Sequence, residues 1–168
     1  MSQRVVTILP LGNTGSLQRA FERLGCQVRT TLDPTVALDA ERLVVPGVGR
    51  FGAYMRALAE HGLDQAIARR INADRPTLCV CVGMQALTEG SAEDSDVAGL
   101  AVLPVRCERV RSRRATAFGW TPLAGAIDDN ACAYFVHAFG VGVTAARTSP
   151  GQWLTAAHID GAPFGAAF

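Results

Sequence analysis

The sequence predicts an α/β fold with a mostly parallel sheet, helices on both faces and antiparallel β additions in the second half. Through residue 87, short apolar runs alternate with amphipathic stretches of helical length, a pattern that requires crossover connections. The apolar runs are continuous, as in strands buried on both faces. After Gly90, short β-like runs separated by Gly and Pro dominate.

The first half supplies four candidate strands and several helices. The strands are residues 5–9, 27–31, 43–45 and 77–80. Ser16 is a candidate N-cap for a helix that ends at Gly25. Apolar spacing predicts two more helices, from Phe51 to about residue 61 and over residues 63–71, and a helix start at residues 83–87.

The second half is predicted to contain strands rather than helices. Candidate strands are residues 101–105, 108–111, 133–136 and 153–158. No repeat or linker interrupts the sequence, so we expect a single domain over residues 1–168.

Composition excludes several classes of protein. Of 168 residues, 16 are Lys or Arg and 15 are Asp or Glu, a net charge of +1 that favours neither nucleic acid nor a membrane surface. No apolar run approaches the ~20 residues of a membrane span, and the N-terminus lacks a signal-peptide pattern. An odd count of five scattered cysteines indicates a reducing cytoplasm.

One basic cluster has two possible interpretations. It consists of Arg106, Arg109, Arg111, Arg113 and Arg114. It is either a solvated strand-and-loop face or a docking or phosphate-contacting surface.

Cys81 lies at the junction between a buried apolar strand and a predicted helix. A sharp strand-to-helix turn exposes a nucleophile, and Gly83 lets the backbone turn tightly. The helix N-terminus favours the thiolate, and the N–H of Val82 can face an oxyanion. Two other interpretations stay open: Cys81 is an inert buried cysteine, or Cys79 and Cys81 bind metal, for which C-x-C alone is weak evidence.

A glycine-rich loop follows the third predicted strand, at Pro46-Gly47-Val48-Gly49. Such a loop presents backbone N–H groups at the carboxyl edge of a parallel sheet. By itself it is equally compatible with a tight turn, and it lacks both common phosphate-loop spacings.

Together these segments resemble the class I glutamine amidotransferases. The glycine loop resembles their oxyanion strand, and residues 81–85 their nucleophile elbow. Gly12-Asn13, Phe118-Gly119-Trp120 and Tyr134-Phe135-Val136-His137 match, in order, the glutaminase subunit of imidazole glycerol phosphate synthase. The resemblance implies a flavodoxin-like fold, and it covers nearly the whole chain.

The resemblance also implies a mechanism and a partner. Cys81 attacks the amide of glutamine, forming a thioester and releasing ammonia, with Val48 and Val82 N–H groups as the oxyanion hole. Gly47, Gly49 and Gln85 match substrate-contacting positions. Ammonia passes to a (β/α)₈-barrel cyclase subunit in histidine biosynthesis, and no metal or cofactor is expected. Trp120 and Tyr134 match positions near that subunit interface, although core or sheet packing explains them equally well.

One departure from the family concerns the base. The family's His-Pro-Glu motif follows a segment that Gly165-Ala166-Ala167-Phe168 resembles, and the 168 residues do not contain it. None of the three histidines, which are His61, His137 and His158, lies at the position of the histidine in this motif. We therefore expect a C-terminally incomplete amidotransferase domain that is inactive by itself. The alternative is a non-catalytic remnant or scaffold that keeps the fold and binds a cyclase.

Overall fold

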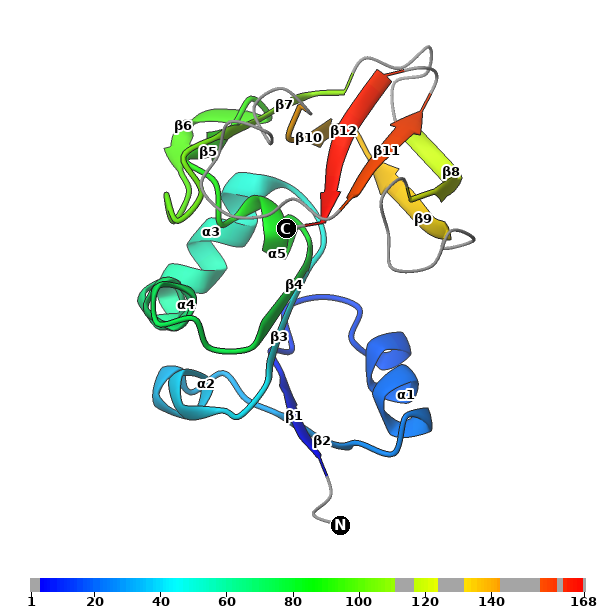
Figure 1. The fold of residues 1–168 in the computed structure, drawn as a ribbon. Coiled ribbons are helices and arrows are strands. Elements are labelled where there is room, and N and C mark those ends of the chain that lie inside the picture. The colour runs from blue at the N-terminus through cyan, green and yellow to red at the C-terminus, as the bar shows by residue number, and fades with distance from the viewer. Residues whose placement is uncertain (1–3, 111–116, 124–131, 143–154, 160–161, 168) are drawn as a thin grey trace. The chain divides into compact units, whose positions relative to one another are not determined.

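The computed structural model describes residues 4–110, 117–123, 132–142, 155–159 and 162–167 (Figure 1). The chain divides into two compact units, Met1–Leu87 and Thr88–Phe168. The single domain expected over residues 1–168 stays a prediction.

Unit 1 is built on a four-stranded sheet in which every pairing is parallel. Its strands are β1 (Val5–Ile8), β2 (Gln27–Thr30), β3 (Leu43–Gly47) and β4 (Thr77–Cys81), in the order β2-β1-β3-β4. The order reverses direction between β1 and β3, as in flavodoxin-like sheets, which bind ligands outside the carboxyl ends of the strands at this point. The predicted parallel sheet is confirmed.

Helices cover both faces of this sheet, as predicted. The structure has α1 (Gly15–Arg23), α2 (Pro34–Asp39), α3 (Phe51–Glu60), α4 (Leu63–Asn72) and α5 (Val82–Gln85). In Figure 1, α1 lies on one side of the strands and α2, α3 and α4 lie on the other. The face that α1 covers buries Val6, Ile8 and Val44, and partly buried Leu17, Phe21, Cys26 and Val28 pack against them.

Two predictions for the helices were wrong. Helix α1 begins at Gly15 with Thr14 as N-cap, so Ser16 lies inside the first turn and does not cap the helix. Helix α2 was missed, although its start carries a clear signal. The Asp33 carboxylate accepts hydrogen bonds from the N–H groups of Thr35 and Val36, and Pro34 occupies the first turn, where its missing N–H costs nothing.

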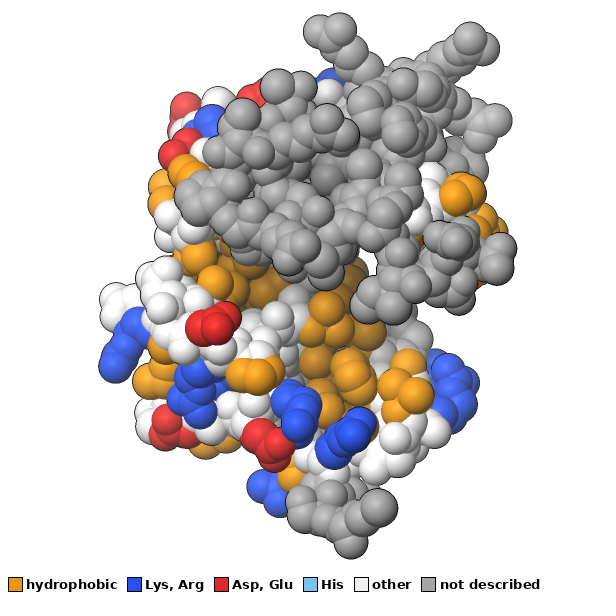
Figure 2. Space-filling model, viewed as in Figure 1, with side chains coloured by type: hydrophobic (Ala, Val, Ile, Leu, Met, Phe, Trp, Pro, Cys, Tyr) orange, Lys and Arg blue, Asp and Glu red, His pale blue; other side chains and the backbone are white. Residues whose placement is uncertain are grey.

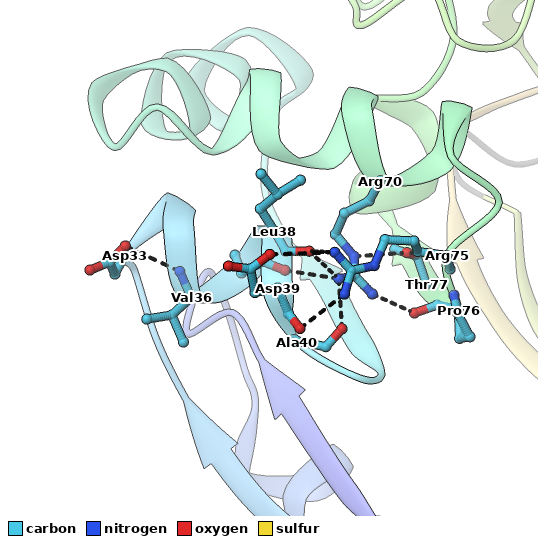
Figure 3. A network of polar contacts seen from close by, with 10 residues as sticks. Asp33, Val36, Leu38, Asp39, Ala40, Arg70, Arg75, Pro76 and Thr77 are labelled. Carbon is cyan, nitrogen blue, oxygen red and sulfur yellow. Dashed lines mark hydrogen bonds and ion pairs between the residues drawn. The ribbon is translucent and has the colours of Figure 1, made fainter.

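A fully buried arginine ties helices α2 and α4 to the start of β4 (Figure 3). The Arg70 guanidinium donates to Thr77 Oγ1 at 3.2 Å and to Pro76 O at 2.9 Å. It also donates to the carbonyls that end α2, those of Ala37, Leu38 and Ala40, at 3.1, 2.7 and 2.8 Å. Burial lowers the pKa of Arg70. The five acceptors satisfy the buried N–H groups of Arg70. The bonds to Pro76 and Thr77 hold the start of β4.

Unit 2 contains short strands, and no helix occurs among its described residues. One sheet has the order β10-β7-β5-β6, from β5 (Gly90–Ser91), β6 (Asp94–Ala98), β7 (Arg106–Arg109) and β10 (Phe139–Gly140). Two antiparallel pairs join β8 (Ala117–Pro122) to β9 (Cys132–His137), and β11 (Thr155–Ile159) to β12 (Ala162–Ala167). The antiparallel additions are confirmed.

Individual strands of unit 2 were predicted less well. Residues 101–105 form no strand, and the strand expected at 108–111 is β7, which begins at Arg106. Strands β5 and β6 were missed because Gly90, Ser91 and Asp94 have low strand propensity. Among the described residues, no helix is both long and apolar enough to cross a membrane.

Candidate functional site

The candidate site lies at the carboxyl edge of the unit 1 sheet, where the loops after β1, β3 and β4 meet. Strands β3 and β4 are in register along their whole length, from Leu43 opposite Thr77 to Gly47 opposite Cys81. The glycine loop and the cysteine junction, which are 34 positions apart in the sequence, therefore end side by side. This is the arrangement that the two sequence motifs require.

Cys81 is exposed at the last position of β4, and its backbone is strained. Its φ of 57° and ψ of −121° place it in a region that residues other than glycine seldom adopt. Backbone strain of this kind is concentrated at functional sites. In a nucleophile elbow, the strained turn directs the side chain out of the sheet. The structure therefore contradicts the interpretation of Cys81 as an inert buried cysteine.

Two glycines allow the backbones of the loop and the elbow to touch. A Cβ added to Gly83 would lie 2.1 Å from the carbonyl oxygen of Val45. A Cβ added to Gly47 would lie 2.5 Å from the Gly83 nitrogen and 3.0 Å from the Tyr54 ring. No side chain fits at either position, so the residue type itself determines how closely the two segments pack.

The rest of the glycine loop faces solvent. Val48 is 57% exposed, and Gly49 has a φ of +89°, which glycine adopts without cost. A Cβ added to Gly12, in the loop after β1, would lie 3.1 Å from the Val48 side chain. Three loops thus surround this corner, and Gly12 is a part of the site that the sequence motifs indicated only as a turn.

The helix that follows Cys81 is shorter than predicted. It is a single turn, α5, from Val82 to Gln85, instead of a helix that continues past Leu87. Because a macrodipole sums aligned peptide units, this turn gives a thiolate less support than a long helix. Val82 and Gln85 are both buried, whereas Cys81 and Gly49 are exposed.

Cys79 and Cys81 differ sharply although both lie on β4. Burial raises the pKa of the Cys79 thiol to about 12. A thiol of this kind is a poor nucleophile at neutral pH, because attack requires the thiolate. Within the described residues, no group of three or more His, Cys, Asp or Glu is placed to hold a metal ion.

Tyr54 is a residue of the site that the sequence motifs did not identify. It lies on α3, is 5% exposed, and donates a hydrogen bond from its hydroxyl to the Pro46 carbonyl at 2.7 Å. Its spacing from Phe51 and Leu58 indicates the buried face of the helix. No sequence pattern reveals which carbonyl accepts the hydrogen bond from its hydroxyl.

The histidines are placed as follows. His61, the one histidine in residues 1–87, caps the C-terminal end of α3. Ten residues of helix, about 15 Å, separate it from the carboxyl edge where α3 begins. His137 lies on β9, where burial lowers its pKa, and His158 lies on β11. His61 is therefore unsuited to act as a base for Cys81.

Two aromatic side chains of unit 2 form an exposed pair. Trp120 and Tyr134 lie opposite each other on β8 and β9, with ring centroids 5.5 Å apart in an edge-to-face arrangement. They are 74% and 53% exposed, and Val136 beside them is 58% exposed. Their exposure contradicts core packing, whereas their cross-strand contact agrees with sheet packing, the other part of the alternative weighed from the sequence.

The basic cluster is only partly described. The Arg109 guanidinium lies 5.7 Å from the centre of the Phe139 ring, and Arg106 donates to Ser95 O at 3.5 Å. The other three arginines lie outside the described residues.

Comparison with known proteins links these features to a family. No protein-family model matches the chain. The imidazole glycerol phosphate synthase subunit HisH of Thermobifida fusca is 39% identical over 151 residues, covering 84% of this chain and 72% of that protein. The subunit of the same name from Cutibacterium acnes is 36% identical over 163 residues, covering 93% and 78%. That of Corynebacterium diphtheriae is 38% identical over 139 residues, covering 77% and 66%.

A solved structure agrees at the level of the fold. A crystal structure of a glutamine amidotransferase superposes with a TM-score of 0.64 at 20% identity, covering 80% of this chain and 72% of that one. The sequence relatives carry the assignment further, because they are 36–39% identical over most of the chain. The chain belongs to the family of the HisH subunit of imidazole glycerol phosphate synthase, the glutaminase family that its sequence motifs resemble.

Proposed function

We propose that this chain is a glutaminase subunit that hydrolyses glutamine to glutamate and ammonia for a cyclase in histidine biosynthesis, in the cytoplasm. The observation that carries the proposal is the strained, exposed Cys81 at the carboxyl end of β4, directly opposite Gly47. Family membership supports glutamine as the substrate, and this geometry supports Cys81 as the residue that attacks it.

The reaction begins when the Cys81 thiolate attacks the amide carbon of the glutamine side chain. A tetrahedral oxyanion forms and collapses to a thioester, ammonia leaves, and water then releases glutamate. The strained backbone of Cys81 supports this role because it directs the side chain away from the sheet.

The backbone N–H groups of Val48 and Val82 are the proposed oxyanion hole. Both residues follow strand ends that lie side by side, since Gly47 and Cys81 pair. Fixed donors of this kind stabilise the charge that develops in the transition state. Gly47 and Gly49 are the proposed loop contacts of the substrate. We propose that Gln85 also contacts the glutamine substrate, and that it does so from beneath the exposed loops, because its side chain is buried.

The proposed partner is the cyclase subunit, for which the sequence resemblance implies a (β/α)₈ barrel. The exposed pair of Trp120 and Tyr134 supports such a contact, because large aromatic side chains are enriched where proteins bind each other. We therefore propose that a partner covers this pair.

Catalytic turnover is a separate question from the position of the nucleophile. Residues 1–168 contain no His-Pro-Glu motif, and His61 lies at the far end of α3. We expect residues 1–168 by themselves to turn over glutamine negligibly, even when a cyclase is added. The second candidate function is a non-catalytic scaffold that binds a cyclase.

Substrate protection tests the proposal without requiring turnover. Alkylation of Cys81 by iodoacetamide is followed by mass spectrometry with and without L-glutamine. We expect L-glutamine to slow labelling of Cys81 and to leave labelling of exposed Cys132 unchanged, whereas D-glutamine protects neither. If L-glutamine does not protect Cys81 but a cyclase still binds, the scaffold interpretation replaces the glutaminase.

A further inference from the structure

We infer that Tyr54 is a positioning residue for the oxyanion loop, because its hydroxyl and ring fix the Pro46–Gly47 peptide, which directly precedes the peptide that carries the Val48 N–H. The inference rests on the proposed function of Cys81 and extends it to a side chain that belongs to neither sequence motif. Tyr54 does not touch the reacting atoms, so its role is to hold the loop that does.

The first step is the hydrogen bond between Tyr54 and Pro46. The hydroxyl lies 2.7 Å from the carbonyl oxygen in a buried setting, a favourable distance for an O–H donor. Burial raises the pKa of the Tyr54 hydroxyl far above its usual value. The hydroxyl therefore stays protonated and keeps donating at every pH at which a protein of this kind works.

The second step is the topology of that bond. Pro46 belongs to β3 and Tyr54 to the first turn of α3, so the bond joins the two ends of the loop over residues 48–50. The Tyr54 backbone N–H also donates to Arg50 O at 3.0 Å. A loop with both ends held samples fewer conformations, and this lowers the entropy lost when its N–H groups orient toward an anion.

The third step is packing. A Cβ on Gly47 would lie 3.0 Å from the Tyr54 ring and 2.5 Å from the Gly83 nitrogen. Gly47 is thus held between the ring and the elbow, with no space on either side. The hydroxyl fixes the carbonyl direction of the Pro46–Gly47 peptide, and the ring fixes the distance of the loop from Cys81.

Two electrophiles separate this role from general stability. With a glutamine-analogue chloromethyl ketone, the thiolate first adds to the carbonyl carbon and gives an alkoxide. The sulfur then bonds to the methylene carbon as chloride leaves with its bonding pair, and the bond between sulfur and the carbonyl carbon breaks as the alkoxide re-forms the C=O bond. Iodoacetamide reacts by direct displacement of iodide and forms no alkoxide. In both reactions the thiol proton passes to buffer. Only the ketone rate therefore depends on the oxyanion loop.

The test variant is Tyr54→Phe, which removes the hydroxyl and keeps the ring, and Thr35→Val, which removes an exposed hydroxyl of the same unit, is the control. We expect Tyr54→Phe to slow ketone labelling of Cys81 about five- to tenfold, as for one lost hydrogen bond. Iodoacetamide labelling changes by less than about twofold, because no oxyanion forms. Thr35→Val alters neither rate.

Amide hydrogen exchange gives a readout that does not depend on reactivity. In Tyr54→Phe we expect faster exchange at the Val48 N–H and unchanged exchange within β3. Equal ketone rates in Tyr54→Phe and the unsubstituted chain would overturn the inference, and so would an equal loss with both electrophiles. If the unsubstituted Cys81 shows neither glutamine protection nor preference for the ketone, the proposed function itself fails, whatever Tyr54 does.

Discussion

The two ends of strand β4 are held in opposite ways. At its start, Pro76 and Thr77 accept hydrogen bonds from Arg70, a side chain with no exposed surface. At its end, glycines at positions 47 and 83 bring backbones together and leave the Cys81 side chain exposed. The first end satisfies its polar groups inside the protein, whereas the second keeps a reactive group accessible. Stability and chemistry are thus separated along one strand of five residues.

The apolar exterior of unit 1 adds to this contrast. Figure 2 shows hydrophobic side chains at the surface of the described part, with arginine side chains beside them. Leu78, in the second position of β4, is 48% exposed, and Val48 at the glycine loop is 57% exposed. The start of β4 is held by the hydrogen bonds from Arg70, and not by these exposed apolar side chains.

The largest effect is expected from comparing Cys79 with Cys81. With a pKa of about 12, Cys79 is about 1000-fold less ionised at neutral pH than a thiol at the ordinary value. We expect iodoacetamide to label Cys81 at least about 1000-fold faster than Cys79 in the folded chain. Peptide mass spectrometry over time measures both rates, with exposed Cys132 as the reference. Similar rates for Cys79 and Cys81 would contradict the contrast within β4.

Gly83→Ala tests the end of β4 where the backbones touch. The added Cβ would lie 2.1 Å from a backbone oxygen, which cannot move as a side-chain end can. We expect a loss of about 3 kcal/mol in the free energy of unfolding, together with altered Cys81 labelling. Gly15→Ala is the control, since its Cβ meets only the end of Arg19 at 3.8 Å. Urea unfolding measures both variants, and an equal effect would refute close packing at Gly83.

Arg70→Met tests the start of β4. The carbonyls of α2 and Pro76 lose their donor, but the cost of burying a charge is also removed. We expect a net loss of about 2 kcal/mol in urea unfolding, with the Cys81 labelling rate of the folded chain unchanged. The exposed neighbour Arg69 gives the control variant Arg69→Met, expected within about 0.5 kcal/mol. A change in Cys81 reactivity would show that the two ends are coupled.

The smallest effect is a dependence of stability on alkaline pH. Because burial raises the pKa of Cys79 in the folded state, the unfolded chain releases its proton first as the pH rises. The stabilisation is fully present below the unfolded pKa of about 9 and is lost as the pH rises above it toward 12. We expect a loss of about 1.4 kcal/mol between pH 8 and pH 10 that is attributable to Cys79.

Cys79→Val provides the measurement of that contribution. Urea unfolding under reducing conditions at both pH values should show a smaller alkaline loss in the variant than in the unsubstituted chain. Cys107, whose pKa burial raises to about 11, contributes in the same direction in both proteins. An identical alkaline loss with and without Cys79 would mean that this thiol is not buried in solution.

Sequence patterns predicted much of the first half because each signal there is local. Apolar runs at β1 and β3 indicate buried strands, and the spacing of Phe51, Met55 and Leu58 indicates one helix face. The strand before Cys81 was predicted at the right place, but the expectation that it is buried was wrong: β4 is last in the strand order and none of its residues is buried. Unit 2 was predicted less accurately, because its strands are short and polar residues such as Asp94 and Arg106 begin them. Such strands form because a neighbour pairs with them, and pairing cannot be seen in a local pattern.

The sequence by itself determined the order of the motifs, the family and the identity of Cys81 as the candidate nucleophile. Only the tertiary structure decided that Gly47 lies opposite Cys81, that Arg70 is buried and that the Tyr54 hydroxyl meets Pro46. The reason is physical. Periodicity and turn chemistry act over a few residues, whereas strand register and the partners of buried polar groups depend on segments that meet only after the chain has folded.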